Sequence, residues 1–121
     1  MTIYRNKDLE WEVVKPGTKR KVIVGKDLML VLWDFGPNQT SSLHSHPHEQ
    51  LSYVVEGEGE FQLDEEKAVL KRGDMAHIPA NIPHAFVSIG DKPLALIDVF
   101  YPIREDLLPK KDKEQRQRSM N

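Results

Sequence analysis

The sequence predicts a single all-β domain, folded as an antiparallel sandwich or barrel. Short runs rich in β-branched and aromatic residues alternate with turns of 2–5 residues that contain Gly, Pro, Asn or Asp. No stretch in this central region carries a helical period. A length of 121 residues fits one domain and is sufficient to bury a core.

The turn residues divide the chain into its expected elements. The expected strands are 21–24, 28–35, 42–46, 50–56, 59–63, 67–70, 75–78, 84–89 and 94–101. Residues 104–108 can form one short helical turn. The run KKDKEQRQR, 110–118, is expected to be solvated or frayed, and a partner-binding tail is the alternative. The predicted domain is therefore 1–109, with the barrel at about 20–103 and a flexible charged tail at 110–121.

Composition excludes several classes of protein and site. The chain has no cysteine, which rules out disulfides, thiolate zinc sites and a cysteine nucleophile. With 17 basic and 19 acidic residues, nothing favours nucleic acid as a partner. No apolar run approaches the ~20 residues that span a bilayer, and no apolar segment of a secretory signal is visible. We therefore expect a cytoplasmic protein without a membrane partner.

Two histidine-rich segments indicate a metal site. Residues 44–50 read HSHPHEQ and residues 73–88 read GDMAHIPANIPHAFVS. On a strand, His44 and His46 point to the same face, and His84 opens a later strand that can close the site. Either Glu49 or Gln50 can face back across the turn. The donors are nitrogen and oxygen only, which suits one divalent ion of Ni, Zn, Mn, Fe or Co.

The spacing of these residues resembles the two-motif signature of the cupin superfamily, over about 36–101. The residues that carry the resemblance are His44, His46, Gln50 and Gly57 in the first motif, and Gly73, Pro79 and His84 in the second. The resemblance implies a single-domain antiparallel jelly-roll barrel, the double-stranded β-helix, with the metal inside it.

The main departure from the cupin pattern is Gln50, which stands where the family has a glutamate ligand. Glu49 is one residue too early by spacing. An amide leaves a divalent ion without charge compensation from its ligands, so the ion should be a stronger Lewis acid and favour an anionic ligand. In addition, Gly36 precedes His44 by more residues than is usual, which indicates a longer turn.

A second group of polar residues lies on the last expected strand. By period two, Asp98 shares a face with two leucines and Phe100. A lone buried carboxylate is costly unless it is paired or used in function. Arg104 follows Pro102 and can bind a substrate carboxylate with two hydrogen bonds. An Asp98–Arg104 ion pair that closes the barrel end is the structural alternative.

The segment DVFYPIRED beside HSHPHEQ resembles the KdgF-type small cupins of pectin and alginate degradation. That resemblance implies conversion of 4,5-unsaturated monouronates, small anionic sugars, into linear keto forms. It assigns the metal ligands to His44, His46, Gln50 and His84, and the other functional residues to Asp98, Phe100 and Arg104. Asp98 would be the acid and base, Arg104 the carboxylate anchor, and Phe100 an apolar wall.

Other readings of the sequence stay open. A different metal-dependent cupin enzyme, such as a dioxygenase or a sugar isomerase, fits the same motifs, as does a non-catalytic cupin that binds a sugar or small acid. His48 is expected to be solvated or to lie behind the ligands, and His77 to lie on a strand surface. The run 28–35 is almost continuously apolar, so a second subunit is expected to cover one of its faces as a homodimer.

Overall fold

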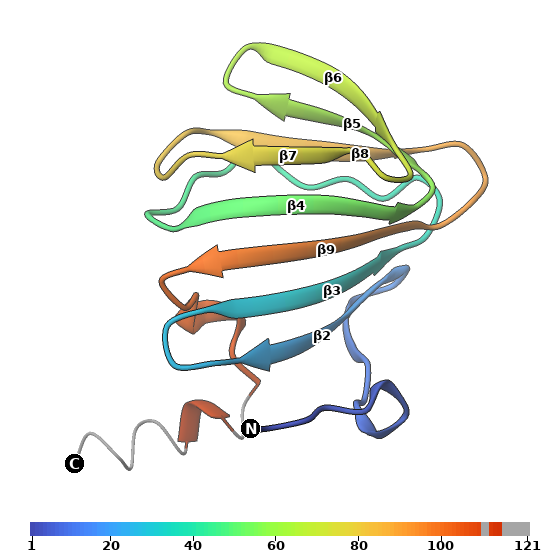
Figure 1. Cartoon of the computed structure of the whole chain (residues 1–121). Coiled ribbons are helices and arrows are strands. Elements are labelled where there is room, and N and C mark those ends of the chain that lie inside the picture. The colour runs from blue at the N-terminus through green and yellow to red at the C-terminus, as the bar shows by residue number, and fades with distance from the viewer. Residues whose placement is uncertain (110–111, 115–121) are drawn as a thin grey trace.

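The computed structural model describes residues 1–109 and 112–114. The chain folds into two antiparallel sheets (Figure 1), a six-stranded one in the order β1-β2-β3-β9-β4-β7 and a three-stranded one in the order β6-β5-β8. The strands are β1 (Glu12–Lys15), β2 (Thr18–Val24), β3 (Met29–Phe35), β4 (Glu49–Glu56), β5 (Glu58–Leu63), β6 (Glu66–Lys71), β7 (Met75–Ile78), β8 (His84–Ile89) and β9 (Leu94–Tyr101). Short 3-10 turns lie at Asn6–Asp8 and Glu105–Leu107.

The core lies between the inner faces of the two sheets. Along β9 the even-numbered residues from Leu94 to Phe100 are buried, which is the expected alternation of a strand with one covered face. One cluster joins Phe35, Val54 and the leucines of β9 to Phe61 and Phe86 of the smaller sheet. A second cluster at the other end of β9 packs Phe100 and Met29 against residues that follow the strand.

The segment between β3 and β4 is not the strand that the sequence predicts for 42–46. It forms single bridges only, Thr40 with Val87 and His44 with His84. The ladder is interrupted because the hydroxyl of Ser41 accepts the Phe86 backbone N–H at 2.9 Å, a role that a backbone carbonyl would otherwise have. The His44–His84 bridge still ties this segment to β8, with N···O distances of 3.0 and 2.8 Å.

Most other elements agree with the predictions, and the differences lie at the ends of the chain. β2 begins before its predicted start at 21, because it forms a hairpin with β1, which was not predicted. The predicted helical turn at 104–108 is the 3-10 turn Glu105–Leu107. Of the predicted tail, 112–114 is helical and the remainder lies outside the described residues. No helix within the described ranges has the length and hydropathy to cross a membrane.

Gly57 is the point where the chain passes from the larger sheet to the smaller one. Its φ of +85° is a left-handed conformation that favours glycine. A Cβ here would overlap the carbonyl oxygen of Pro93 and lie 3.0 Å from Cα of Leu94. The crossing therefore lies directly against the start of β9, where a side chain has no room.

Replacing Gly57 by alanine should cost much more stability than the same change at Gly73. Both residues have positive φ, but nothing lies within 4 Å of a Cβ built at Gly73. We expect Gly73→Ala to lose about 1 kcal/mol from backbone strain alone. Gly57→Ala should lose about 3 kcal/mol because the β9 backbone must also move. Urea unfolding of both variants measures the difference, and equal losses would contradict the close approach.

Candidate metal centre

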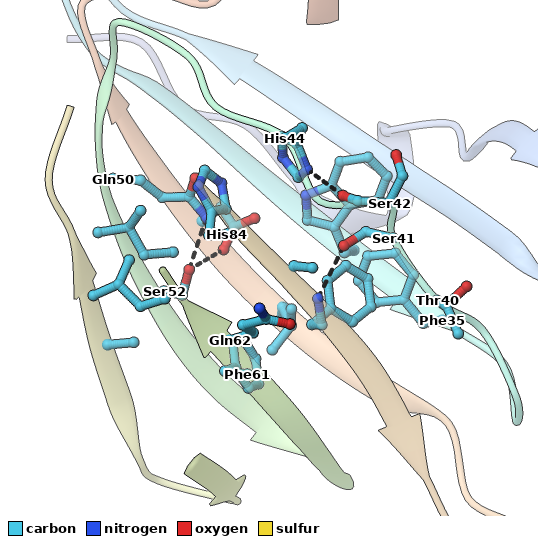
Figure 2. A pocket seen from close by; sticks show the side chains of 18 of the residues that line it. Phe35, Thr40, Ser41, Ser42, His44, Gln50, Ser52, Phe61, Gln62 and His84 are labelled. Atoms are coloured by element: carbon cyan, nitrogen blue, oxygen red, sulfur yellow. Dashed lines mark hydrogen bonds between the residues drawn. The ribbon is translucent and has the colours of Figure 1, made fainter. Parts of the chain in front are cut away.

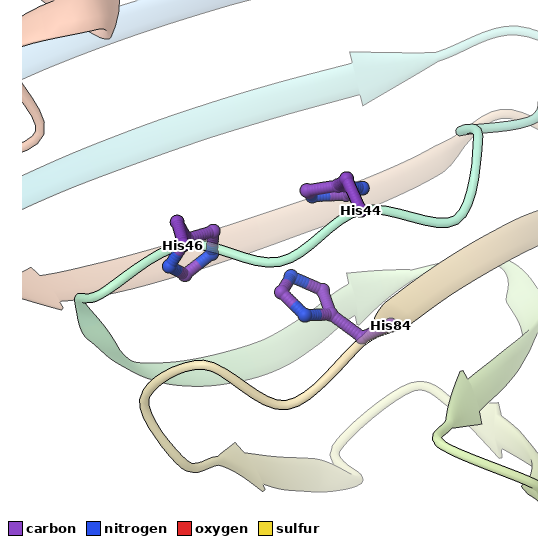
Figure 3. Close-up of side chains that lie close together, drawn as sticks. All are labelled: His44, His46 and His84. Atoms are coloured by element: carbon purple, nitrogen blue, oxygen red, sulfur yellow. The ribbon is translucent and has the colours of Figure 1, made fainter.

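Three histidines from two segments meet on the inner side of the barrel (Figure 3). His44 and His46 belong to the segment that precedes β4, and His84 opens β8. One potential ligand atom from each lies within 4.8 Å of the other two. The His44–His84 bridge brings the two segments together, so the cluster depends on backbone pairing as well as on the side chains.

All three imidazoles are oriented by backbone carbonyl groups. The Nδ1 atoms of His44, His46 and His84 lie 2.7, 3.0 and 2.9 Å from the carbonyl oxygens of Ser42, His48 and Ile82. Because a carbonyl only accepts, Nδ1 of His44 and Nδ1 of His84 carry the proton, and the Nε2 atom of each ring presents a lone pair. His46 faces an oxygen at both nitrogens, so its contacts fit either tautomer. The Nε2 atom of His84 is buried and has no hydrogen-bond partner among the described residues. A buried lone pair beside two other imidazoles fits a metal ion.

The electrostatic environment favours the neutral, metal-binding form of His46 and His84. Burial lowers the pKa of His46 to about 4, and the positive charge of Arg104 adds to that effect. Burial also lowers the pKa of His84. Neutral imidazoles at physiological pH need no deprotonation to accept a cation.

Gln50 lies beside the histidine cluster and begins a polar chain that leads away from it. Its Oε1 is 3.1 Å from Nε2 of His46. Its Nε2 donates to Oγ of Ser52 at 3.0 Å, and that hydroxyl donates to Oδ1 of Asp98 at 2.6 Å. When the proton of His46 is on Nε2, it is donated to Oε1 of Gln50; when it is on Nδ1, two electron-rich atoms face each other, an arrangement that a cation near both would stabilise.

Asp98 is the buried carboxyl group of the site, on the inner face of β9 and 6% exposed. Burial raises its pKa to about 6, although hydrogen bonds from Ser52 and Gln50 and the charge of Arg104 act in the opposite direction. A carboxyl group that titrates near neutral pH can both accept and release a proton.

Arg104 and Phe100 form the side of the site nearest the chain's last 3-10 turn. The guanidinium carbon of Arg104 lies 5.1 Å from the ring centre of Phe100, and that ring packs edge-on against His46 at 5.7 Å. Arg104 pairs with Asp106, at 2.7 Å from Nη2 and 3.3 Å from Nε, rather than with Asp98 as in the structural alternative. This contact uses one edge of the guanidinium and leaves the Nη1 side directed elsewhere.

These residues line one cavity of about 380 Å³ between the two sheets (Figure 2). His44, His84, Gln50 and Ser52 lie at one end, and Phe35 and Phe61 lie toward the other. Asp98, Phe100 and Arg104 also line it. The volume is in the range of pockets for small molecules, and the polar groups converge on one part of it.

Glu49, His48 and His77, which the sequence did not favour as metal ligands, lie outside the cluster of His44, His46 and His84. Glu49 is exposed and bonds Nε2 of His77 at 2.8 Å on the outer side of β4 and β7. His48 contributes its backbone carbonyl to orient His46, a position behind the cluster. Sequence reasoning missed Ser52 and Asp106. Ser52 is recognisable as the hydroxyl between Gln50 and Val54 on an inner face, whereas Asp106 carries no signal.

Comparison with known proteins identifies the class. A model of the cupin domain matches residues 31–100, so the chain belongs to the cupin family. Within it, the chain is 38% identical over 100 residues to the pectin degradation protein KdgF of Dickeya dadantii (strain 3937), covering 81% of this chain and 90% of that protein.

Two solved structures agree with this placement. KdgF from Halomonas sp. has a TM-score of 0.83 and 34% identity, covering 89% of this chain and 99% of that chain. An RmlC-like cupin from Shewanella frigidimarina NCIMB 400 has the same TM-score and 33% identity, covering 89% and 96%. The predictions of an all-β single-domain cupin and of a KdgF-type relationship are confirmed.

The raised pKa of Asp98 and the lowered pKa of His46 have opposite effects on stability in metal-free protein. Asp98 holds its proton more tightly when folded, so its contribution falls as pH rises from about 4 to 6. His46 holds its proton less tightly when folded, so its contribution rises from about pH 4 to 6.5. The two contributions should largely cancel in the wild type.

Asp98→Asn should remove the contribution of Asp98 to the pH dependence of stability and leave that of His46. Between pH 4 and 7, the stability of the variant relative to wild type should increase by about 3 kcal/mol, since each pKa unit corresponds to 1.36 kcal/mol. Urea unfolding in the presence of a chelator gives the free energy of unfolding of variant and wild type at each pH. Titratable groups that the two proteins share contribute equally to both values, so they cancel from the difference. A difference that does not vary with pH would contradict the raised pKa of Asp98.

Proposed function

We propose that this chain is a metal-dependent enzyme that converts 4,5-unsaturated monouronates, released from pectin or alginate, into their linear keto forms. The observation that carries the proposal is the chain of polar contacts that runs from the histidine cluster through Gln50 and Ser52 to buried Asp98. It joins a site for a cation to a group that can move a proton, inside one cavity. The similarity to KdgF, a pectin degradation protein, supports the substrate class.

In this proposal the metal ligands are His44, His46, Gln50 and His84, and the ion is divalent. Four neutral ligands leave the positive charge of the ion uncompensated, and Asp98 lies behind the ligand Gln50, hydrogen-bonded by Ser52 and Gln50. When bound, the ion supplies a Lewis acid that stabilises negative charge on an oxygen of the substrate. The remaining coordination positions would be open to that oxygen.

Arg104 is proposed as the anchor for the substrate carboxylate. Its bidentate contact with Asp106 fixes the plane of the guanidinium, and its position over Phe100 directs it toward the cavity that it lines. The Nη1 side can then meet a carboxylate. Phe100 would serve as an apolar wall and also hold His46 in place by its edge-on contact.

Asp98 is proposed as the group that moves the proton. As a carboxylate it takes the proton from the anomeric hydroxyl, the ring carbon–oxygen bond breaks, and an aldehyde forms at that end. The electrons of the enol ether then form the ketone as Asp98 returns the proton to carbon 4. The reaction is an isomerisation, so it needs no co-reactant, and a pKa of about 6 suits both transfers.

The proposed activity can be followed by the loss of ultraviolet absorbance of the unsaturated uronates that a pectate or alginate lyase produces. Wild-type protein loaded with a divalent metal should accelerate this loss above its spontaneous rate. His84→Ala should abolish the excess rate because it removes a ligand. Asp98→Asn should lower the rate by about 10²–10⁴-fold while the metal stays bound, since the amide cannot exchange the proton.

Controls separate this activity from the other cupin functions. Arg104→Lys should raise KM far more than it lowers kcat, because lysine keeps the charge but loses the two-pronged contact. Full turnover by Asp98→Asn would exclude its proton-transfer role. A metal-loaded wild type that shows no excess rate would refute the uronate assignment. A redox change of bound iron on exposure to O₂ would then favour a dioxygenase, and binding without turnover would favour a carrier.

We further propose that the chain is a homodimer formed through the outer face of its larger sheet. The register of β3, β9 and β4 aligns two apolar rows across this face, Leu30–Val99–Leu51 and Leu32–Ile97–Tyr53. Leu51 and Tyr53 are 55% and 42% exposed. A second copy is the proposed partner because the same flat apolar face is complementary to itself about a two-fold axis.

Sedimentation equilibrium should give about twice the chain mass of 13.9 kDa. Leu51→Glu should yield a monomer, because a charge in the centre of the interface is costly when it is desolvated. Val69→Glu is the matched control, since Val69 is 48% exposed on β6 of the smaller sheet. A monomeric wild type would refute this interface, as would a Leu51→Glu variant that stays dimeric.

A further inference from the structure

We propose that Ser52 is a positioning residue: its hydroxyl turns the oxygen of the Gln50 amide toward the histidine cluster and holds the Asp98 carboxyl group in place. This inference rests on the metal centre of the proposed function but not on its substrate. The residue lies in the middle of β4 and is 2% exposed. It pairs directly with Asp98 on β9, and it shares the inner face with Gln50 two positions earlier.

The direction of the hydrogen bonds follows from what each group can do. An ionised carboxylate only accepts, so the Ser52 hydroxyl must donate its hydrogen to Oδ1 of Asp98, at 2.6 Å. The Ser52 Oγ then acts as an acceptor, and it receives Nε2–H of Gln50 at 3.0 Å. The amide oxygen of Gln50 is thereby directed to the other side, 3.1 Å from Nε2 of His46.

This orientation matters because the two ends of an amide are almost equal in shape. The oxygen carries lone pairs for a cation, whereas the NH₂ group offers only hydrogens. Without the Ser52 hydroxyl as an acceptor for its NH₂ group, the Gln50 side chain would be held less firmly in the orientation that presents its oxygen to the histidines. A glutamate at this position would not have this ambiguity. With an amide in place of a carboxylate, the site requires a neighbour that fixes which end of the side chain faces the histidines, and Ser52 is that neighbour.

Serine is the residue that fits this position. The next inner-face residue, Val54, is buried and apolar, so a hydroxyl here is unfavourable unless both of its hydrogen-bonding capacities are used. Both are used, one by Gln50 and one by Asp98. Partners that orient metal ligands in this way typically contribute a factor of about 10–100 in metal affinity.

The test is titration of the purified, metal-free chain with Co²⁺, which reports both the dissociation constant and the visible spectrum of the bound ion. Ser52→Ala should bind Co²⁺ about 10–100-fold more weakly than wild type, with an altered spectrum. Ser52→Thr and Ser52→Val have nearly the same shape and differ by one hydroxyl. Ser52→Thr should bind about as tightly as wild type, and Ser52→Val should resemble Ser52→Ala.

Ser88→Ala is the matched control, because Ser88 is also buried, on β8, and its hydroxyl hydrogen-bonds to the turn that contains Gly36 and Gln39, away from the histidine cluster. It should lose stability but keep its Co²⁺ affinity. Equal affinities and spectra for wild type, Ser52→Ala and Ser52→Val would overturn the role of Ser52. If Ser52→Ala does not fold, the threonine and valine variants decide, and equal binding by those two overturns the proposal. A wild type that binds no Co²⁺ would instead refute the metal centre itself.

Discussion

The register of β9 against β4 is the constraint on which the site depends. It places Ser52 opposite Asp98 and Gln50 opposite Phe100, and all four side chains point into the barrel. Because side chains alternate along a strand, a slip of one residue would turn all of them to the outer face. The polar chain, the edge-on contact of Phe100 with His46 and the cavity wall therefore form together or not at all. β9 also pairs with β3, so both of its edges hold that register.

Within this frame, the environment of the site determines its charges. Burial favours the neutral form of His46 and His84, and a neutral imidazole or the amide of Gln50 contributes no charge, so a cation held by these ligands would keep its full positive charge. The carboxylate that could offset it, Asp98, lies behind Gln50 and is hydrogen-bonded by Ser52 and Gln50. Arg104 adds a second positive charge at the cavity wall. An anionic ligand is therefore favoured at one end of the cavity, where the low dielectric strengthens each interaction.

Sequence reasoning could predict the features that have a short period or a fixed spacing. The alternation in β4 and β9 assigns Gln50 and Asp98 to inner faces, and the motif spacing brings His84 to the histidine pair. It could not predict how segment 36–48 pairs, because the hydroxyl of Ser41, in place of a backbone carbonyl, accepts the backbone N–H of Phe86. Nor could it predict that Arg104 pairs with Asp106, since both residues lie beyond the last strand, where the alternation of side chains along a strand no longer fixes their directions.

The substitution of an amide for a carboxylate shows why such details matter. A glutamate beside the histidines would hold a cation by charge alone and would tolerate an imprecise environment. Gln50 has only the dipole of its amide, which works in one of two orientations, so the site needs a neighbour of defined polarity. That neighbour in turn needs an acceptor, and the buried carboxyl of Asp98 is one. Gln50, Ser52 and Asp98 thus form one hydrogen-bonded arrangement. It is possible because side chains two residues apart on β4 share a face, and because β4 pairs with β9 in this register.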